Sequence, residues 1–265
     1  MQMKEMLRRL GQPAGGAALL GMAAILYGVA CLLQGEFSDS WQPVPQGLPL
    51  RQPLAYLCAG LLILAGAGLL ITRTVRPAAM TLLVVFGFYD ACYLLKLVGS
   101  PTDFNSLMGL AEQLSVVVGC GAILIRMRDG GPAAVATARI AFGICSIVFG
   151  LSHLKDLEGL AKAVPAWIPP GQIFWAAATG VGHLAVGLGL LANRLAISAT
   201  RLGALMYSCF VVLGWLPEIF KHPTLWLRWE GAGMSLCMAG ALWLVGDLLA
   251  ERRQRGESTN PAFVL

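Results

Sequence analysis

Charged residues are scarce in this chain of 265 residues: only 12% are Asp, Glu, Lys or Arg, whereas 57% are hydrophobic. Soluble globular proteins contain about a quarter charged residues, because polar side chains must cover their surface. So few polar side chains cannot cover a soluble body of this size. A mean hydropathy of +0.71 and 32 glycines instead indicate helices that pack closely against one another in lipid.

Motifs for metal binding and thiol chemistry are also missing. The seven cysteines form no C-x-x-C pair, and no Cys or His spacing is typical of a zinc site. All seven lie in apolar runs, where a free thiol behaves as a small hydrophobic side chain. With only three histidines in the chain, we expect no metal site. The net charge of +5 does not indicate nucleic-acid binding, because the basic residues lie in short groups between apolar runs.

Eight apolar runs are long enough to cross a bilayer, which takes about 20 residues of helix. The runs are continuous and do not alternate, which excludes a strand barrel. Their breaks carry Pro, Gly or charged residues. The expected spans are 16–34, 53–72, 77–98, 107–126, 134–153, 172–192, 197–216 and 231–250. The sequence therefore predicts an all-α integral membrane protein with eight transmembrane helices.

The distribution of positive charge predicts the orientation in the membrane. If the N-terminus lies inside, 13 of the 19 Lys and Arg residues fall on the inner face and 6 on the outer face. No small-residue cleavage site follows the first run, so we expect it to remain as a span. With an even number of spans, both termini then lie on the cytoplasmic side of a bacterial inner membrane.

The two halves of the sequence share landmarks in the same order. The string GAGLLITR at 66–73 returns as GLGLLANR at 187–194, and Glu112 has a counterpart in Glu230. We interpret the chain as two four-helix units, 1–128 and 129–265, the second with a polar C-terminal tail. Because each unit has four spans, both enter the membrane from the same side and form parallel repeats.

Several strings in the second half carry a family resemblance: FGLSH at 149–153, VPAWIP at 164–169, TGVGHL at 179–184 and GLGLL at 187–191. With them, this half resembles the DoxX-like family of bacterial membrane proteins, and the first half resembles a weaker copy. Many family members have Glu in a Thr-Gly-x-x-Glu-Leu motif where this chain has His183. The first half has Leu62 at the matching position, so we expect it to have lost the polar group.

Five ionisable residues are candidates for a polar pocket. An Asp, Lys or Arg at the centre of a span costs about 2.5–3.5 kcal/mol, so each such side chain needs a partner or a role. His183, Asp90 and Glu112 lie within expected spans, and His153 and Glu230 lie at the outer ends of two others. All five lean towards the outer side, which predicts a pocket there. Two alternatives remain: the helix-end residues reach the headgroups, and Asp90 and His183 form structural hydrogen bonds between helices.

The resemblance implies a function in redox chemistry, because some members of the family are named as thiosulfate:quinone oxidoreductase subunits. We therefore expect an accessory or redox-associated subunit that binds a small hydrophobic molecule such as a quinone. We do not expect an enzyme in its own right; an active chain would be a subunit of a quinone-linked oxidoreductase. Two alternatives stay open. One is transport of a small solute between the two units, and the other is a non-catalytic assembly factor with a membrane protein partner.

Overall fold

The computed structural model of the chain describes residues 15–256, and every regular element in that range is helical. Eight segments are long and apolar enough to span a membrane, which confirms the predicted all-α membrane fold. They are Gly15–Gln34 (α2), Arg51–Leu69 (α3), Val75–Gly99 (α4, preceded by the short η1, Thr72–Thr74), Phe104–Met127 (α5), Pro132–Lys155 (α6), Gln172–Leu191 (α8), Ala196–Lys221 and Trp226–Gln254 (α11). The seventh comprises α9 (Ala196–Cys209), η2 (Phe210–Trp215) and α10 (Leu216–Lys221), and the short α7 is Leu157–Ala161.

Local sequence explains where these helices begin and end. Helix α2 ends at Gly35, whose φ of +74° favours glycine and stops the helix. Helix α5 begins after Asp103, which accepts hydrogen bonds from the Asn105 backbone N–H and the Ser106 hydroxyl. Helix α6 begins with Pro132, which suits the first turn because it has no backbone N–H to satisfy there.

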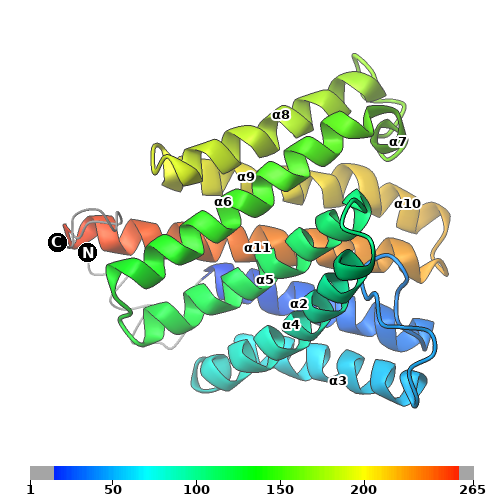
Figure 1. Cartoon of the computed structure of the whole chain (residues 1–265), viewed down its shortest axis with the longest axis horizontal. Helices are drawn as coiled ribbons and strands as arrows, with labels where there is room; N and C mark the ends of the chain where they lie inside the picture. The colour runs from blue at the N-terminus through cyan, green and yellow to red at the C-terminus, as the bar shows by residue number, and fades with distance from the viewer. Residues whose placement is uncertain (1–14, 257–265) are drawn as a thin grey trace.

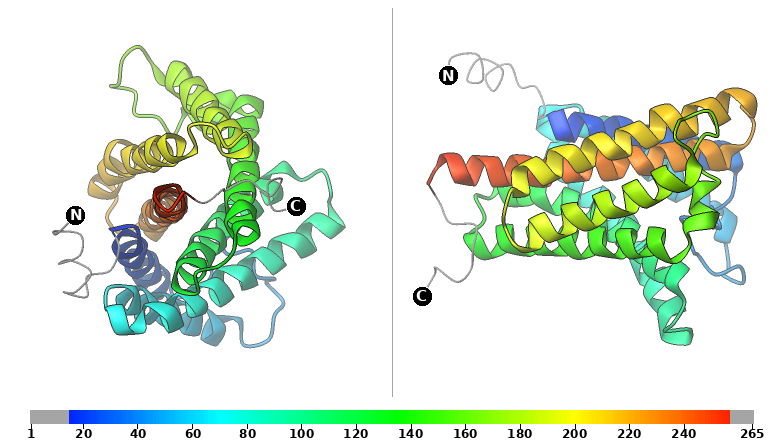
Figure 2. Two further views of the ribbon diagram at one scale, coloured as in Figure 1. Left: turned by 90° about the vertical axis from the view of Figure 1, so that its left-hand side faces the viewer. Right: turned by 90° about the horizontal axis from the view of Figure 1, so that it is seen from above.

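Helix α11 occupies the centre of the bundle, with the other helices around it (Figure 2). In its most apolar stretch 83% of the residues are buried, against 33–56% in the other seven spans. Small residues permit this packing: a methyl group added at Gly233 would lie 2.8 Å from the Cβ of Tyr27, and one at Gly240 would lie 2.7 Å from the backbone nitrogen of Leu20. Helix α2 therefore lies directly against α11.

The outer surface of the bundle is apolar. Large side chains on four helices point away from the protein interior, as expected for contact with lipid tails. Examples are Leu64 on α3, Val84 on α4, Leu188 on α8 and Leu202 on α9. The chain is thus a multi-pass membrane protein whose surface contacts the bilayer.

The seventh span changes its helical geometry midway. Between α9 and α10 the backbone forms a π-helical segment, η2, which directly precedes the turn containing Pro217. Proline cannot donate the backbone hydrogen bond of a regular α-helix, and π-helical turns recur at such irregularities and near functional sites. Phe210, the first residue of η2, faces the histidine cluster described below.

The loop at 35–50 folds into the bundle instead of standing out from it. Phe37, Ser38 and Gln42 are buried. The Tyr93 hydroxyl of α4 donates a 2.8 Å hydrogen bond to the Ser40 carbonyl, and the Gln113 amide of α5 donates one of 2.8 Å to the Trp41 carbonyl. The loop therefore closes the first half of the bundle at the end away from the start of α2 and the end of α11 (Figure 1).

Candidate functional site

His183 lies at the centre of an aromatic cluster in the second half of the chain. It lies on α8, and its side chain is buried in the bundle. Its imidazole centroid lies 5.0 Å from that of His153, 5.3 Å from Tyr207, 5.5 Å from Phe149 and 6.1 Å from Phe210. We call these five residues, from α6, α8, α9 and η2, the second-half cluster. No hydrogen bond to the His183 imidazole occurs among the described residues.

The orientation of His153 follows from its hydrogen bond. Its Nδ1 lies 2.9 Å from the Phe149 carbonyl oxygen, which can only accept, so Nδ1 carries the proton. In the neutral imidazole, Nε2 is then left as an acceptor. Gly180 allows α8 to come this close, because a Cβ there would lie 2.8 Å from the Cβ of His153. The two histidines thus meet across a close helix crossing.

The hydroxyl of Tyr207 has no hydrogen-bond partner in residues 15–256, although it is buried. Glu112 on α5 is half-buried and lies within electrostatic range of this hydroxyl. Glu112 itself makes no hydrogen bond or ion pair with another described residue. The second-half cluster therefore combines apolar rings with an imidazole, a phenol and a nearby carboxyl group that leave hydrogen-bonding capacity unused.

Asp90 lies deeper in the bundle, on the buried face of α4. Its Oδ1 has no partner in the part of the chain that the structure describes. Cys145 on α6 and Tyr93 on its own helix are within electrostatic range. Cys145 precedes His153 by about two helical turns along α6, so Asp90 lies apart from the second-half cluster.

Glu230 belongs to different surroundings. It is fully buried in the second turn of α11, because that helix begins at Trp226 and not near residue 231 as expected. Within residues 15–256 neither carboxyl oxygen is placed to form a hydrogen bond, although the Ser38 hydroxyl and the Cys31 thiol are near enough to interact with it. Tyr27, one turn before Cys31, is within electrostatic range, and its hydroxyl is also unpartnered in this range.

Around Glu230 lies a second aromatic cluster, whose other members come from the first half of the chain. The Tyr27 and Phe86 rings are stacked at 6.3 Å, and Phe86 meets Tyr89 edge to face at 6.1 Å. We call Tyr27, Cys31, Phe86, Tyr89 and Glu230 the first-half cluster. Gln42 of the 35–50 loop inserts into it, donating hydrogen bonds to the Tyr89 hydroxyl at 2.9 Å and to the Cys31 sulfur at 3.3 Å.

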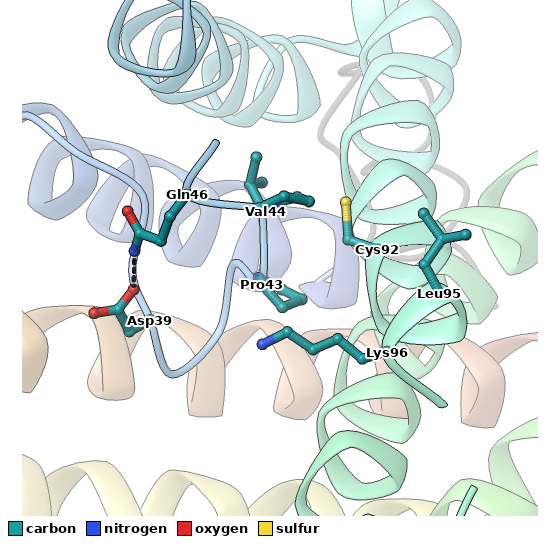
Figure 3. A pocket seen from close by; sticks show the side chains of 8 residues that line it. Asp39, Pro43, Val44, Gln46, Cys92, Leu95 and Lys96 are labelled. Atoms are coloured by element: carbon teal, nitrogen blue, oxygen red, sulfur yellow. Dashed lines mark hydrogen bonds between the residues drawn. The ribbon is translucent and has the colours of Figure 1, made fainter. Parts of the chain in front are cut away.

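An open hollow of about 620 Å³ lies beside this loop (Figure 3). Asp39 and residues 43–46 form one wall, and Cys92, Leu95 and Lys96 of α4 form the other. Gln46 donates a 3.1 Å hydrogen bond to Asp39 across the loop. Pro43, which lines the hollow, directly follows Gln42, which inserts into the first-half cluster.

The structure brings together some of the five sequence-predicted residues and separates others. His153 and His183 touch, and Glu112 approaches the same cluster through Tyr207. Asp90 lies only within electrostatic range of Cys145, and Glu230 lies in the first-half cluster. Among residues 15–256, no group of three or more His, Cys, Asp or Glu side chains is placed to share a metal ion.

Sequence reasoning missed Tyr207 and Gln42. Tyr207 lies in an apolar run, where a tyrosine is usually interpreted as a core or interface side chain. Gln42 lies between Trp41 and Pro43 in an expected surface loop, where an amide gives no sign of burial. Only the packing of distant segments assigns them to these clusters.

Comparison with known proteins identifies one region. Residues 134–217 match the family model for DoxX. The match runs from α6 to just past η2, so it includes the whole second-half cluster but not Glu112 or Glu230. Neither the curated proteins nor the solved structures contained a match to the chain.

Proposed function

Because the chain is a DoxX-like membrane protein, with a DoxX domain at residues 134–217, we propose that it binds a small hydrophobic ring molecule of the quinone class at the second-half cluster. Its role is that of an accessory or redox-associated subunit. His153, His183 and Glu112, with Tyr207, form the site. The site lies in an inner membrane, on the side opposite the two termini, which face the cytoplasm.

One observation carries this proposal: the His183 imidazole and the Tyr207 hydroxyl are both buried with no hydrogen-bond partner among the described residues. A buried polar group without a partner costs about 1–3 kcal/mol, and water is scarce in the bilayer interior. Two such groups with ring centroids 5.3 Å apart supply N–H and O–H donors to one molecule. A bound ligand would therefore satisfy both.

The aromatic side chains of the cluster favour a ring-shaped ligand. Phe149 and Phe210 offer ring faces and edges, which pack well against another ring. A quinone combines an apolar ring with carbonyl oxygens that accept hydrogen bonds, so it matches both the rings and the donors. The half-buried His153 and Glu112 then lie where a bound carbonyl or its reduced hydroxyl can exchange protons with them.

Binding of ubiquinone-1 to the protein in detergent tests the proposal. The substitution His183→Phe keeps a ring but removes a hydrogen bond, worth about 0.5–1.5 kcal/mol, so Kd should rise about 3- to 10-fold. Tyr207→Phe should have a similar effect, because it removes only the hydroxyl. His222→Phe is the matched control, since His222 is exposed between α10 and α11 and should leave Kd unchanged.

An unchanged Kd in both cluster variants, or no binding to the wild-type protein, would reject the quinone site. The two other hypotheses have their own signatures. Transport predicts flux of a small solute into proteoliposomes, altered by Asp90→Asn. An assembly factor predicts a companion membrane protein that co-purifies in mild detergent and is lost without any change in quinone content.

A further inference from the structure

The two halves of the molecule cross their first two helices in corresponding ways. A Cβ at Gly66 would lie 2.6 Å from the Gly21 carbonyl oxygen, and one at Gly187 would lie 2.9 Å from the Gly143 carbonyl oxygen. Positions 21 and 143 are 122 residues apart, and 66 and 187 are 121 apart. The α2–α3 and α6–α8 crossings therefore use glycines at matching positions, which supports two copies of one unit.

The same offset relates the aromatic clusters. Tyr27 and Phe86 correspond to Phe149 and Tyr207. The ring centroids are 6.3 Å apart in the first pair and 6.5 Å apart in the second, although the first pair is stacked at 21° and the second meets edge to face at 90°. Phe86 meets Tyr89 at 6.1 Å and 88°, and the corresponding Tyr207 and Phe210 meet at 5.8 Å and 89°. The first-half cluster is thus a counterpart of the second-half cluster. Its polar groups differ, because Cys31 stands at the position of His153 and Leu62 at that of His183.

The carboxyl group near each cluster comes from the other half of the chain. Glu112 belongs to the first half but lies within electrostatic range of Tyr207 in the second-half cluster. Glu230 belongs to the second half but lies beside Tyr27 and Cys31 in the first-half cluster. Each cluster therefore receives its carboxyl group from the last helix of the other half.

The two clusters differ in what fills them. In the first-half cluster the Gln42 amide donates to Tyr89 and Cys31, and its oxygen accepts a 2.8 Å hydrogen bond from the Ser38 backbone N–H. An amide carries a carbonyl acceptor and N–H donors, so it uses the groups that a polar ring ligand would use. Even so, the Glu230 oxygens and the Tyr27 and Ser38 hydroxyls stay unpartnered in the described range.

We infer that the first-half cluster is a second site for a ring molecule with hydrogen-bonding oxygens, closed by Gln42 and entered from the hollow between the 35–50 loop and α4. The inference rests on the proposed function, which supplies the class of ligand. The geometry of the first-half cluster supplies the location of the site. The hollow of about 620 Å³ is open to the surface, so it gives a small molecule access to the 35–50 loop. Pro43, next to Gln42, lines it (Figure 3).

The test counts ubiquinone-1 molecules bound per chain in detergent. The substitution Gln42→Ala removes the three hydrogen bonds that close the first-half site, so occupancy should rise from about one to about two per chain. Gln52→Ala is the matched control, because Gln52 at the start of α3 is exposed, its side chain hydrogen-bonds only the Gly35 carbonyl oxygen among the described residues, and it does not line the hollow. It should leave occupancy at about one.

A double variant separates this inference from the proposed function. The double variant combines His183→Phe, which weakens the second-half site, with Gln42→Ala, which opens the first-half site. It should still bind about one ubiquinone-1 molecule tightly per chain. Adding Glu230→Gln should abolish this remaining tight binding. If the wild type binds quinone but the double variant does not, the second site is refuted and the proposed function stands. If only the double variant binds, the second site stands and the proposed function fails.

Labelling of Cys31 supplies a readout that does not depend on occupancy counts. Cys31 is buried, and Gln42 covers its sulfur. Alkylation by N-ethylmaleimide, mapped by peptide mass spectrometry, should become faster in Gln42→Ala, and ubiquinone-1 should slow it again. Faster alkylation that quinone does not slow would overturn the inference, because it would mean an open loop without a site. Gel filtration and helix content verify that each variant is folded.

Discussion

Several charged side chains near the ends of the bundle form ion pairs, whereas the buried carboxyl groups of Asp90 and Glu230 form none with the described residues. The pairs are Arg126–Glu251, Arg201–Asp247, Arg252–Asp129, Arg255–Asp129 and Arg51–Glu36. Glu230 and Asp90, by contrast, have buried oxygens without a partner among residues 15–256. A lone charged group is energetically costly in a membrane interior. We therefore expect the unpaired carboxyl groups to be protonated or to bind a ligand.

Asp129 provides a prediction about pH at this scale. A hydrogen bond from Arg255, with the nearby positive charges of Arg255 and Arg252, holds the pKa of the Asp129 carboxyl below its ordinary value. A lowered pKa means that the ion pair stabilises the fold above about pH 4, and that this contribution disappears as the pH falls through the lowered pKa. Between pH 7 and pH 3 the apparent Tm in detergent should therefore fall.

The variant Asp129→Asn isolates this contribution. At pH 7 its apparent Tm should be slightly below that of the wild type, because the pair is exposed and screened by solvent. The difference between the two proteins should shrink as the pH falls from 7 to 3, because Asp129 becomes protonated. A difference that persists unchanged at pH 3, or that is insensitive to added salt at pH 7, would contradict the ion-pair explanation.

At the scale of helices, glycines set how closely neighbours approach. Gly21 and Gly66 let the backbones of α2 and α3 touch, and Gly180 lets α8 reach His153. Other glycines lie in the same helices with open space around them, for example Gly60 on α3. Position on the helix, and not glycine content, therefore decides which glycines hold the bundle together.

The pair Gly66→Ala and Gly60→Ala tests this. A methyl group at 66 would meet the Gly21 carbonyl oxygen at 2.6 Å, and this backbone atom can move only with its helix. Gly66→Ala should destabilise the protein by about 1–3 kcal/mol, seen as a lower apparent Tm in detergent. Gly60→Ala meets nothing within 4 Å and should be neutral or stabilising by about 0.5–1 kcal/mol. Equal effects of the two changes would refute the close-crossing account.

At the scale of the whole molecule, the eight spans place the start of α2 and the end of α11 at the same end of the bundle (Figure 1). The excess of Lys and Arg at that end predicts that it faces the cytoplasm. The opposite end carries the 35–50 loop and the hollow beside it. Ligands would then reach the clusters from the outer leaflet or the outer solution.

Cysteine labelling in whole cells tests this orientation. His222→Cys places a thiol in the exposed turn between α10 and α11, and Arg194→Cys places one in the exposed turn between α8 and α9. A membrane-impermeant maleimide should label the first variant in intact cells and the second only after the cells are opened. The reverse pattern would invert the topology. The native cysteines give little background, because all but Cys209 are buried.

The sequence by itself determined the class of the protein and the approximate limits of its eight spans. Hydropathy is a local property, so continuous apolar runs are sufficient to locate membrane helices. Two limits differ most, the end of the seventh span at Lys221 and the start of the last helix at Trp226; the latter arises because Arg228 and Glu230 interrupt the apolar run although the helix continues through them. His153 and His183 were also found from sequence, because an ionisable side chain in an apolar run is conspicuous.

Only the tertiary structure decided which of these residues meet. Glu112 and Glu230 occupy similar places in the sequence of each half, yet each lies by the cluster of the other half, and Gln42 is buried although it belongs to a loop. Likewise, nothing in the composition of α11 places it at the centre of the bundle. These outcomes depend on which small residues let two particular backbones approach, and such contacts join positions a hundred or more residues apart that no local pattern connects.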